Sequence, residues 1–192
     1  MPKPLQQPHP PLWVAARDPD TYDFAVKQGL DVMATPLSKP DTEVENLAGK
    51  LVKAVSDNPG ARRPRFMVLR RTCVYEDDRD WRIPADAAFE DARVFNGLFH
   101  NAAGVVNGFP TPMDAVNAGA SPPSSETLRD SLMFGTPEHV VERIRRYAAL
   151  GVDDYCYGVS FGLPHDFAMR SLELFGREVM PHFTKKTPSG PR

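Results

Sequence analysis

The segment LWVAARDPDTYDFAVKQGLDVM, residues 12–33, holds the pattern from which the fold class follows. Leu12–Ala16 is a continuous apolar run, which is typical of a strand that is buried on both faces. Asp18 followed by proline predicts a helix start, because Asp caps free backbone N–H groups and proline fits the first helical position. Gly29 predicts the end of that helix, and Leu30–Met33 is a second candidate strand. This order of strand, helix and strand is typical of a parallel β/α unit.

The same alternation continues along the chain. Further strands are expected at Arg65–Tyr75 and Asp154–Val159, and further helices at residues 44–55, 136–151 and 164–180. A long excursion over Glu76–Phe134 interrupts the pattern. It contains a Gly/Pro-rich loop at 104–125 and one helix with an apolar face of Ala88, Ala92, Phe95 and Phe99. Four strand–helix units predict an α/β fold of parallel β/α units, either a small open sheet or half of a (β/α)8 barrel.

Composition excludes several classes of protein. With 192 residues, of which 41% are hydrophobic, the chain can bury one core, and we expect a single domain over 1–183 with a flexible tail at 184–192. The net charge of −2 lacks the excess of positive charge that is typical of proteins that bind nucleic acid or an anionic membrane. Cys73 and Cys156 are the two cysteines, so a disulfide framework is excluded. The histidines lack metal-ligand spacing, and no segment has the pattern of a membrane span or signal peptide. A cytoplasmic protein without a metal is expected.

Three segments in order along the chain resemble the bacterial luciferase-like flavin-dependent monooxygenases. They are PKPLQQPHPPLWVAARDPDTYDFAVKQG at residues 2–29, SLMFGTPEHVVERIRRYAALGVDDY at 131–155 and MRSLELFGREVMPHF at 169–183. The first is similar to the family's loop into its fifth barrel strand. The second is similar to its Gly-Ser/Thr-Pro-Glu helix with the following strand, and the third to its closing helix.

The resemblance implies the second half of a (β/α)8 TIM barrel, and therefore a truncated C-terminal half of such an enzyme. It also implies reduced FMN, or in some branches F420, as the cofactor, O₂ as the oxidant and a small organic molecule as the substrate. A flavin reductase is an expected partner. The alternative is a half-barrel without catalytic activity that pairs with itself, as a homodimer, or with a partner chain, because an open half-barrel leaves strand edges unpaired.

By the same resemblance, the loop and helix start after the first strand receive the flavin, with Ala16, Arg17, Asp18 and Thr21 as the candidate cofactor-binding residues. Free N–H groups at a helix start attract a phosphate, and Arg17 can add a charge-assisted hydrogen bond. Asp18 would repel a phosphate unless its carboxylate caps the helix, and we favour the cap. Met33 and Thr35 could face the same pocket, although we interpret them as packing. The family's usual catalytic histidine belongs to the other half, so the catalytic residues are unknown.

Two other features have competing interpretations. Gly158–Gly162 matches the G-x-S-x-G nucleophile elbow, with Ser160 as a candidate nucleophile and Asp166 and His182 in hydrolase order. Too little chain follows Ser160 to supply the loops of a serine hydrolase, so this remains a remote alternative.

Arg70 and Arg71 are unusual within a strand, and alternation places them on opposite faces. One could point into the barrel mouth, but we favour side chains that extend to solvent at the strand end.

Overall fold

The computed structural model describes residues 5–97, 105–110 and 123–184. Phe99, most of the expected loop at 104–125 and the expected tail beyond Thr184 lie outside the described residues. Contacts divide the chain into two compact units. The first unit contains Met1–Arg70 and Ile144–Tyr157, and the second contains Arg71–Arg143 and Gly158–Arg192. The expected single domain over 1–183 stays a prediction.

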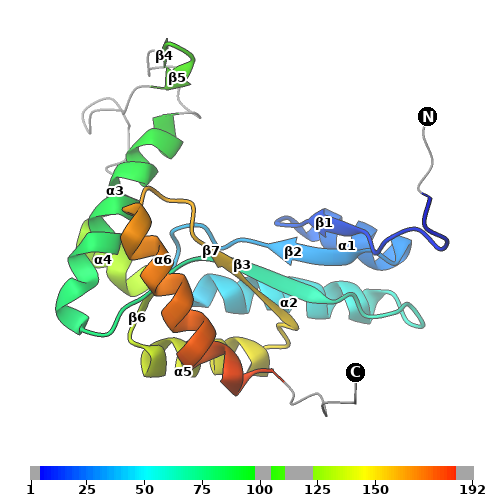
Figure 1. Ribbon diagram of the computed structural model, residues 1–192. Helices are drawn as coiled ribbons and strands as arrows, with labels where there is room; N and C mark the ends of the chain where they lie inside the picture. Colours follow the sequence, from blue (N-terminus) through cyan, green and yellow to red (C-terminus); the bar gives the residue numbers. More distant parts are fainter. Residues whose placement is uncertain (1–4, 98–104, 111–122, 185–192) are drawn as a thin grey trace. The chain divides into compact units, whose positions relative to one another are not determined.

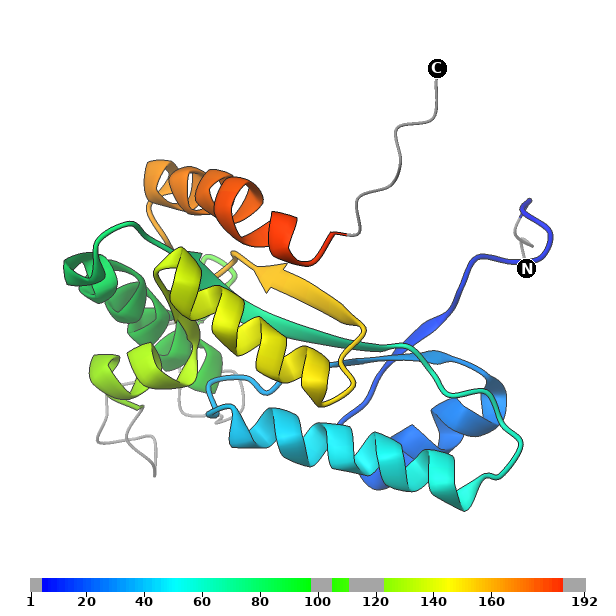
Figure 2. The same cartoon turned by 90° about the horizontal axis from the view of Figure 1, so that it is seen from below.

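The first unit is built around parallel strands. Strands β1 (Trp13–Ala15), β2 (Asp31–Ala34) and the first part of β3 (Phe66–Val74) pair side by side in parallel (Figure 1). Strand β7 (Asp154–Gly158) also pairs with β3. Helices α1 (Pro19–Gln28) and α2 (Thr42–Asp57) connect the strands and lie side by side (Figure 2). The predicted α/β fold of parallel β/α units is confirmed.

Local sequence signals explain how α1 begins and ends. The Asp18 carboxylate accepts a hydrogen bond from the Thr21 N–H at 3.0 Å, and proline occupies the first helical turn. Gly29 closes the helix with a left-handed φ of 67°, and its N–H is directed to the Ala25 and Val26 carbonyls. The predicted cap and stop of this helix are both confirmed.

The parallel register arranges side chains of the first unit in rows that alternate between the two faces of the sheet. Val14, Val32 and Phe66 form one row, in which Val32 and Phe66 are fully buried. The next row contains Ala15, Met33 and Met67, which are half-buried or exposed. Successive residues of a strand point to opposite faces, so one face is buried and the other is open in the described part of this unit.

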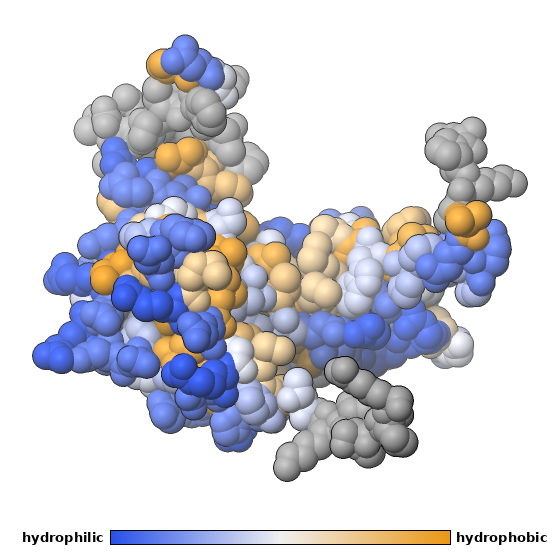
Figure 3. All heavy atoms as spheres, in the orientation of Figure 1, coloured by the Kyte–Doolittle hydropathy of each residue, from blue (hydrophilic) through white to orange (hydrophobic). Residues whose placement is uncertain are grey.

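The expectation that the first strand is buried on both faces is therefore wrong. Trp13 and Val14 are half-buried and Ala15 is exposed. A continuous apolar run shows that both faces of a strand are apolar, but it does not show that both are covered. In Figure 3, apolar side chains lie over β1 and β2, whereas hydrophilic side chains gather along α2.

The second unit packs helices around the end of β3. Its described elements after β3 are η1 (Asp78–Trp81), α3 (Arg82–Gly97), β4 (Val105–Val106), β5 (Phe109–Pro110), α4 (Ser125–Ser131), β6 (Met133–Gly135), the start of α5 (Pro137–Ala149), α6 (His165–Leu174), η2 (Phe175–Val179) and η3 (Met180–His182). Its core contains Cys73, Tyr75, Ala88, Leu128, Leu132, Phe134 and Phe161. No helix in the described ranges is long and apolar enough to cross a membrane.

Helix α4 and strand β6 are among the elements that begin inside the segment that we expected to be an excursion. Strand β6 pairs in parallel with the end of β3, and α4 precedes it with Ser124 as its cap. A three-residue strand is too short to show a period in the sequence, which is why β6 was missed. The strand Arg65–Tyr75 was predicted almost to its ends.

Phe66 and Met67 are neighbours on β3 that point to opposite faces of the sheet in the first unit, one buried and one open, so they test whether only one face is covered. We expect Phe66→Ala to lower the free energy of unfolding by about 3–5 kcal/mol, because it leaves a cavity in the covered face. We expect Met67→Ala to cost about 1 kcal/mol, because that side chain is already in partial contact with water. Denaturant unfolding of both variants measures the difference. A loss at Met67 as large as that at Phe66 would mean that the second face is covered in solution.

Candidate functional site

An apolar hollow of about 210 Å³ lies at the carboxyl ends of β1 and β2 in the first unit. It is lined by Ala15, Ala16, Arg17, Met33, Ala34, Thr35 and Leu69. Three of these residues are alanines, so the backbone of both strands can be approached closely. Barrel enzymes build their active sites at this end of the strands, which makes the hollow the candidate functional site.

Arg17 is held at the rim of the hollow by two partners. Its Nη1 donates a hydrogen bond to the Thr35 carbonyl at 3.0 Å, and its Nη2 lies 3.4 Å from Glu43 Oε1. The side chain keeps 43% of its surface exposed. A guanidinium has five N–H donors, so Arg17 retains donors for an anionic ligand after these two contacts.

Asp18 and Thr21 lie outside the lining of the hollow and are directed to each other. Asp18 accepts hydrogen bonds from the Thr21 N–H at 3.0 Å and from the Thr21 hydroxyl at 2.8 Å. These bonds, with the hydroxyl bond contributing most, hold the pKa of Asp18 below its usual value. The carboxylate is therefore charged and occupies the helix start as a cap. Of the four residues expected at the flavin, the structure brings Ala16 and Arg17 together at the hollow.

Glu43, in the first turn of α2, was missed by the sequence analysis although it anchors Arg17. Its side chain is 12% exposed and also accepts hydrogen bonds from Lys39 at 3.2 Å and Asn46 at 3.4 Å. Burial alone would raise the pKa of Glu43, but these bonds and the charges of Lys39 and Arg17 hold it below its usual value. An acid in the first turn of a helix is ordinarily a dipole partner, so its sequence position gave no signal of this role.

The two strand arginines have different surroundings from those expected. Arg70 is fully buried, with its guanidinium against the loop between β2 and α2, so the extension to solvent that we favoured is wrong for this residue. Carbonyl and carboxylate acceptors inside the unit satisfy its donors, which removes the need for water. In the second unit, Arg71 is paired with Asp91 of α3 and is partly buried.

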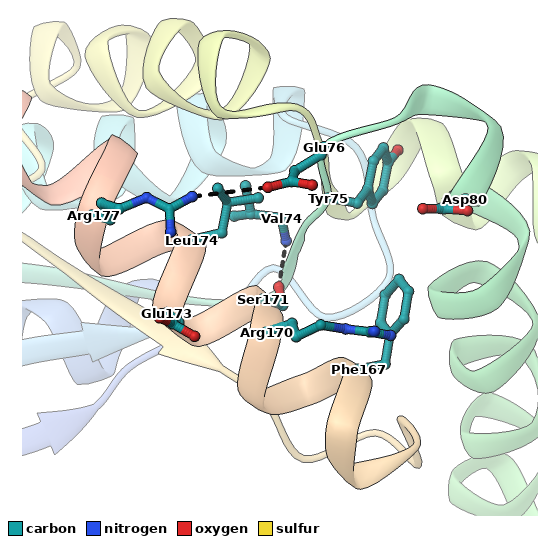
Figure 4. A pocket seen from close by; sticks show the side chains of 10 residues that line it. All are labelled: Val74, Tyr75, Glu76, Asp80, Phe167, Arg170, Ser171, Glu173, Leu174 and Arg177. Atoms are coloured by element: carbon teal, nitrogen blue, oxygen red, sulfur yellow. Dashed lines mark hydrogen bonds and ion pairs between the residues drawn. The ribbon is translucent and has the colours of Figure 1, made fainter.

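A second and larger hollow, of about 360 Å³, lies in the second unit between the end of β3 and α6 (Figure 4). Ser171 accepts a hydrogen bond from the Val74 N–H at 2.6 Å, and Arg177 lies 3.8 Å from Glu76. Arg170 stacks on Phe167, with its guanidinium carbon 5.6 Å from the ring centre. The lining also contains Asp80 and Glu173, so both signs of charge are present and the hollow does not select one class of ligand.

Other candidate residues of the second unit show no catalytic arrangement. Ser160 lies in an exposed turn, and within the described ranges it has no hydrogen bond to a histidine or a carboxylate. Cys73 is buried, and that burial raises the pKa of its thiol to about 12. The described residues also contain no group of three or more His, Cys, Asp or Glu side chains that could hold a metal ion. The expectation of no metal stays a prediction.

The lowered pKa of Glu43 gives a pH dependence. The carboxylate stabilises the fold fully above its usual pKa of 4.5, and this contribution is lost as the pH falls through the lower pKa of the folded state. Glu43→Gln removes the titrating group. We therefore expect the advantage of the wild type over Glu43→Gln in free energy of unfolding to be constant near neutral pH and to shrink below pH 4.5. Denaturant titrations at a series of pH values measure it, and an advantage that persists unchanged in acid would contradict this assignment.

Comparison with known proteins identifies the family. A family model described as luciferase-like monooxygenase matches residues 1–154. The oxygenase component of a flavin-dependent trigonelline monooxygenase from Acinetobacter baylyi is 35% identical over 185 residues, which is 96% of this chain and 51% of that protein. The chain spans about half the length of the curated relatives it matches.

Solved structures agree on the fold. The oxygenating constituent of 3,6-diketocamphane monooxygenase from Pseudomonas putida, in complex with FMN, matches with a TM-score of 0.62 at 18% identity, over 91% of this chain and 49% of that one. An F420-dependent secondary alcohol dehydrogenase matches over the same shares with a TM-score of 0.57 and 18% identity. Since the family model covers most of its length, the chain belongs to the luciferase-like monooxygenase family.

Proposed function

We propose that the protein containing this chain is a flavin-dependent monooxygenase that uses reduced FMN together with O₂ to oxygenate a small organic molecule. With F420, which transfers hydride and does not activate O₂, the same site would instead support a dehydrogenase, as in the F420-dependent neighbour. The observation that carries the proposal is the apolar hollow at the carboxyl ends of β1 and β2, in a chain of the luciferase-like family. The flavin dependence of the Acinetobacter baylyi relative supports the choice of cofactor. The chain represents the C-terminal half of such an enzyme in this proposal.

The residues around the hollow fit part of a flavin. Ala15, Ala16 and Ala34 leave room for a flat ring to approach the strands, and Arg17 offers charged donors at the rim. The volume of about 210 Å³ is smaller than the ~300 Å³ or more of a typical complete ligand pocket. The hollow would therefore hold one portion of the cofactor, and other parts of the protein would hold the rest.

Each component of the reaction has a distinct origin. Reduced flavin, when bound, supplies the two electrons with which one atom of O₂ enters the substrate and the other leaves as water. The chain's own residues bind and orient the flavin, and the apolar lining of the hollow excludes water from it. Arg17, fixed by Thr35 and Glu43, neutralises an anionic group of the flavin without moving.

The 35% identical relative suggests where to begin with substrate and partner. It acts on trigonelline and is an oxygenase component, so trigonelline is the first substrate to test and a separate flavin reductase is the partner that we propose. The choice between FMN and F420 is decided by binding both. The cytoplasmic location remains a prediction from the sequence.

The open sheet face supports a second candidate function. We propose that the row of Ala15, Met33 and Met67 is covered in the working protein by a complementary half-barrel, because TIM-barrel interiors are filled by layers of such side chains. In the catalytically silent version, a homodimer or a partner chain supplies the cover and no flavin is bound. A mass measurement in solution, compared with 21.3 kDa for one chain, together with flavin titration separates the two functions.

Arg17 provides the direct test of the flavin site. We expect the wild-type protein to bind FMN or F420 and, with reduced flavin, to consume O₂ in the presence of substrate. Arg17→Gln should weaken flavin binding by about tenfold or more, because the charged donors are lost. Lys53→Gln is the control, since Lys53 pairs with Asp57 on the exposed surface of α2. Equal flavin affinity in both variants would argue against the site, and no flavin binding by the wild type would argue against the function.

A further inference from the structure

Arg70 contacts the loop that joins β2 to α2, and this loop flanks the candidate flavin site. We propose that Arg70 is a positioning residue that fixes the shape of this loop and thereby holds Arg17 at the rim of the hollow. The inference rests on the proposed function for its consequence in flavin binding. Its structural part stands on contacts within the first unit alone.

Two backbone carbonyls of the loop depend on Arg70 for a hydrogen-bond donor. Arg70 Nη1 donates hydrogen bonds to the Leu37 carbonyl at 3.2 Å and to the Lys39 carbonyl at 2.8 Å. Leu37 has a φ of 55°, a left-handed conformation that is uncommon for a residue with a branched side chain. Such conformations persist where the surroundings over-determine them, and the buried guanidinium supplies that constraint here.

The other two donor nitrogens of Arg70 reach Asp41, at the end of the same loop, and Tyr147 of α5. Nη2 lies 3.2 Å from Asp41 Oδ1, and Nε donates to the Tyr147 hydroxyl at 3.1 Å. The Tyr147 hydroxyl in turn donates to the same Asp41 oxygen at 2.5 Å. Asp41 occupies the cap position of α2, but its carboxylate makes no capping hydrogen bond there. Its carboxylate therefore contacts Arg70 and Tyr147 rather than the N–H groups at the start of the helix.

The loop connects this buried cluster to Arg17. The two partners of Arg17 are the Thr35 carbonyl, at the start of the loop, and Glu43, just after its end. Lys39 Nζ adds a contact of 3.2 Å to the same Glu43 oxygen that Arg17 approaches. Arg70 fixes the residues between these two anchors, so the separation of the anchors, and hence the position of the Arg17 guanidinium, depends on Arg70.

The cluster requires arginine rather than another cation. Four acceptors, three on the loop and one on α5, converge on the Nε, Nη1 and Nη2 atoms, which the planar guanidinium presents in a fixed geometry. The single ammonium of a lysine retains the charge but cannot reach acceptors that are spread around the edge of the guanidinium. Arg70→Lys therefore removes the positioning while it keeps the charge.

The test compares Arg70→Lys with Arg71→Lys in the full-length product of the gene. Arg71 is the matched control, because it is the next residue on β3 and pairs with Asp91 of α3 rather than with the loop. We expect Arg70→Lys to speed backbone hydrogen exchange in the peptide covering residues 35–43. We also expect it to weaken flavin binding by about tenfold while kcat at saturating flavin stays within about threefold of the wild type. Arg71→Lys should change neither loop exchange nor flavin affinity.

Each outcome decides the inference. Unchanged loop exchange and flavin affinity in folded Arg70→Lys would overturn it, and so would an equal fall in kcat and flavin affinity. If Arg70→Lys does not fold, Tyr147→Phe, which removes one hydroxyl of the cluster, should raise exchange in 35–43 above exchange elsewhere, and a uniform rise would overturn the inference. A wild type that binds no flavin overturns the proposed function and the binding half of this inference, whereas loop exchange still decides the positioning role.

Discussion

The other features of the first unit depend on a parallel sheet that has helices on one of its faces. The register places Val14, Val32 and Phe66 in one row, of which Val32 and Phe66 are fully buried and Val14 is half-buried, and it places Ala15, Met33 and Met67 in the next row on the open face. Because side chains alternate strictly along a strand, the apolar residues of both rows cannot be covered by the same helices. The candidate site follows from this arrangement, since its hollow lies where the open face meets the carboxyl ends of β1 and β2.

Ion pairs and carbonyl contacts, rather than free groups at a helix start, define the rim of that hollow. Asp18 and Thr21 satisfy each other at the start of α1, which leaves a charged carboxylate where a phosphate would meet the helix. Arg17 is positioned by Thr35 and Glu43, and the loop between them is held from inside the unit by Arg70. Arg17 is thus available to a ligand, whereas Arg70 has a structural role.

The sequence predicted the α/β fold, the long strand β3 and both ends of α1, because these depend on local patterns such as the Asp18 cap and the Gly29 stop. It did not predict β6, which is too short to have a period, or the exposure of Ala15, which depends on what covers the sheet. The burial of Arg70 was also missed, because its acceptors lie on a loop and on Tyr147, 77 residues away along the chain. Ala16 and Arg17 were expected at the site by resemblance, but the anchoring of Arg17 by Glu43 required the three-dimensional structure.

An experimental structure of the protein with FMN bound tests this account most directly. The account predicts that the flavin ring lies on the open face of the sheet against Ala15 and Met33, with an anionic group of the flavin in contact with Arg17. It also predicts that Asp18 still caps α1 and that Arg70 still contacts the carbonyls of Leu37 and Lys39. Flavin bound instead in the hollow lined by Arg170 and Phe167, with the one beside Ala15 and Met33 empty, would contradict it.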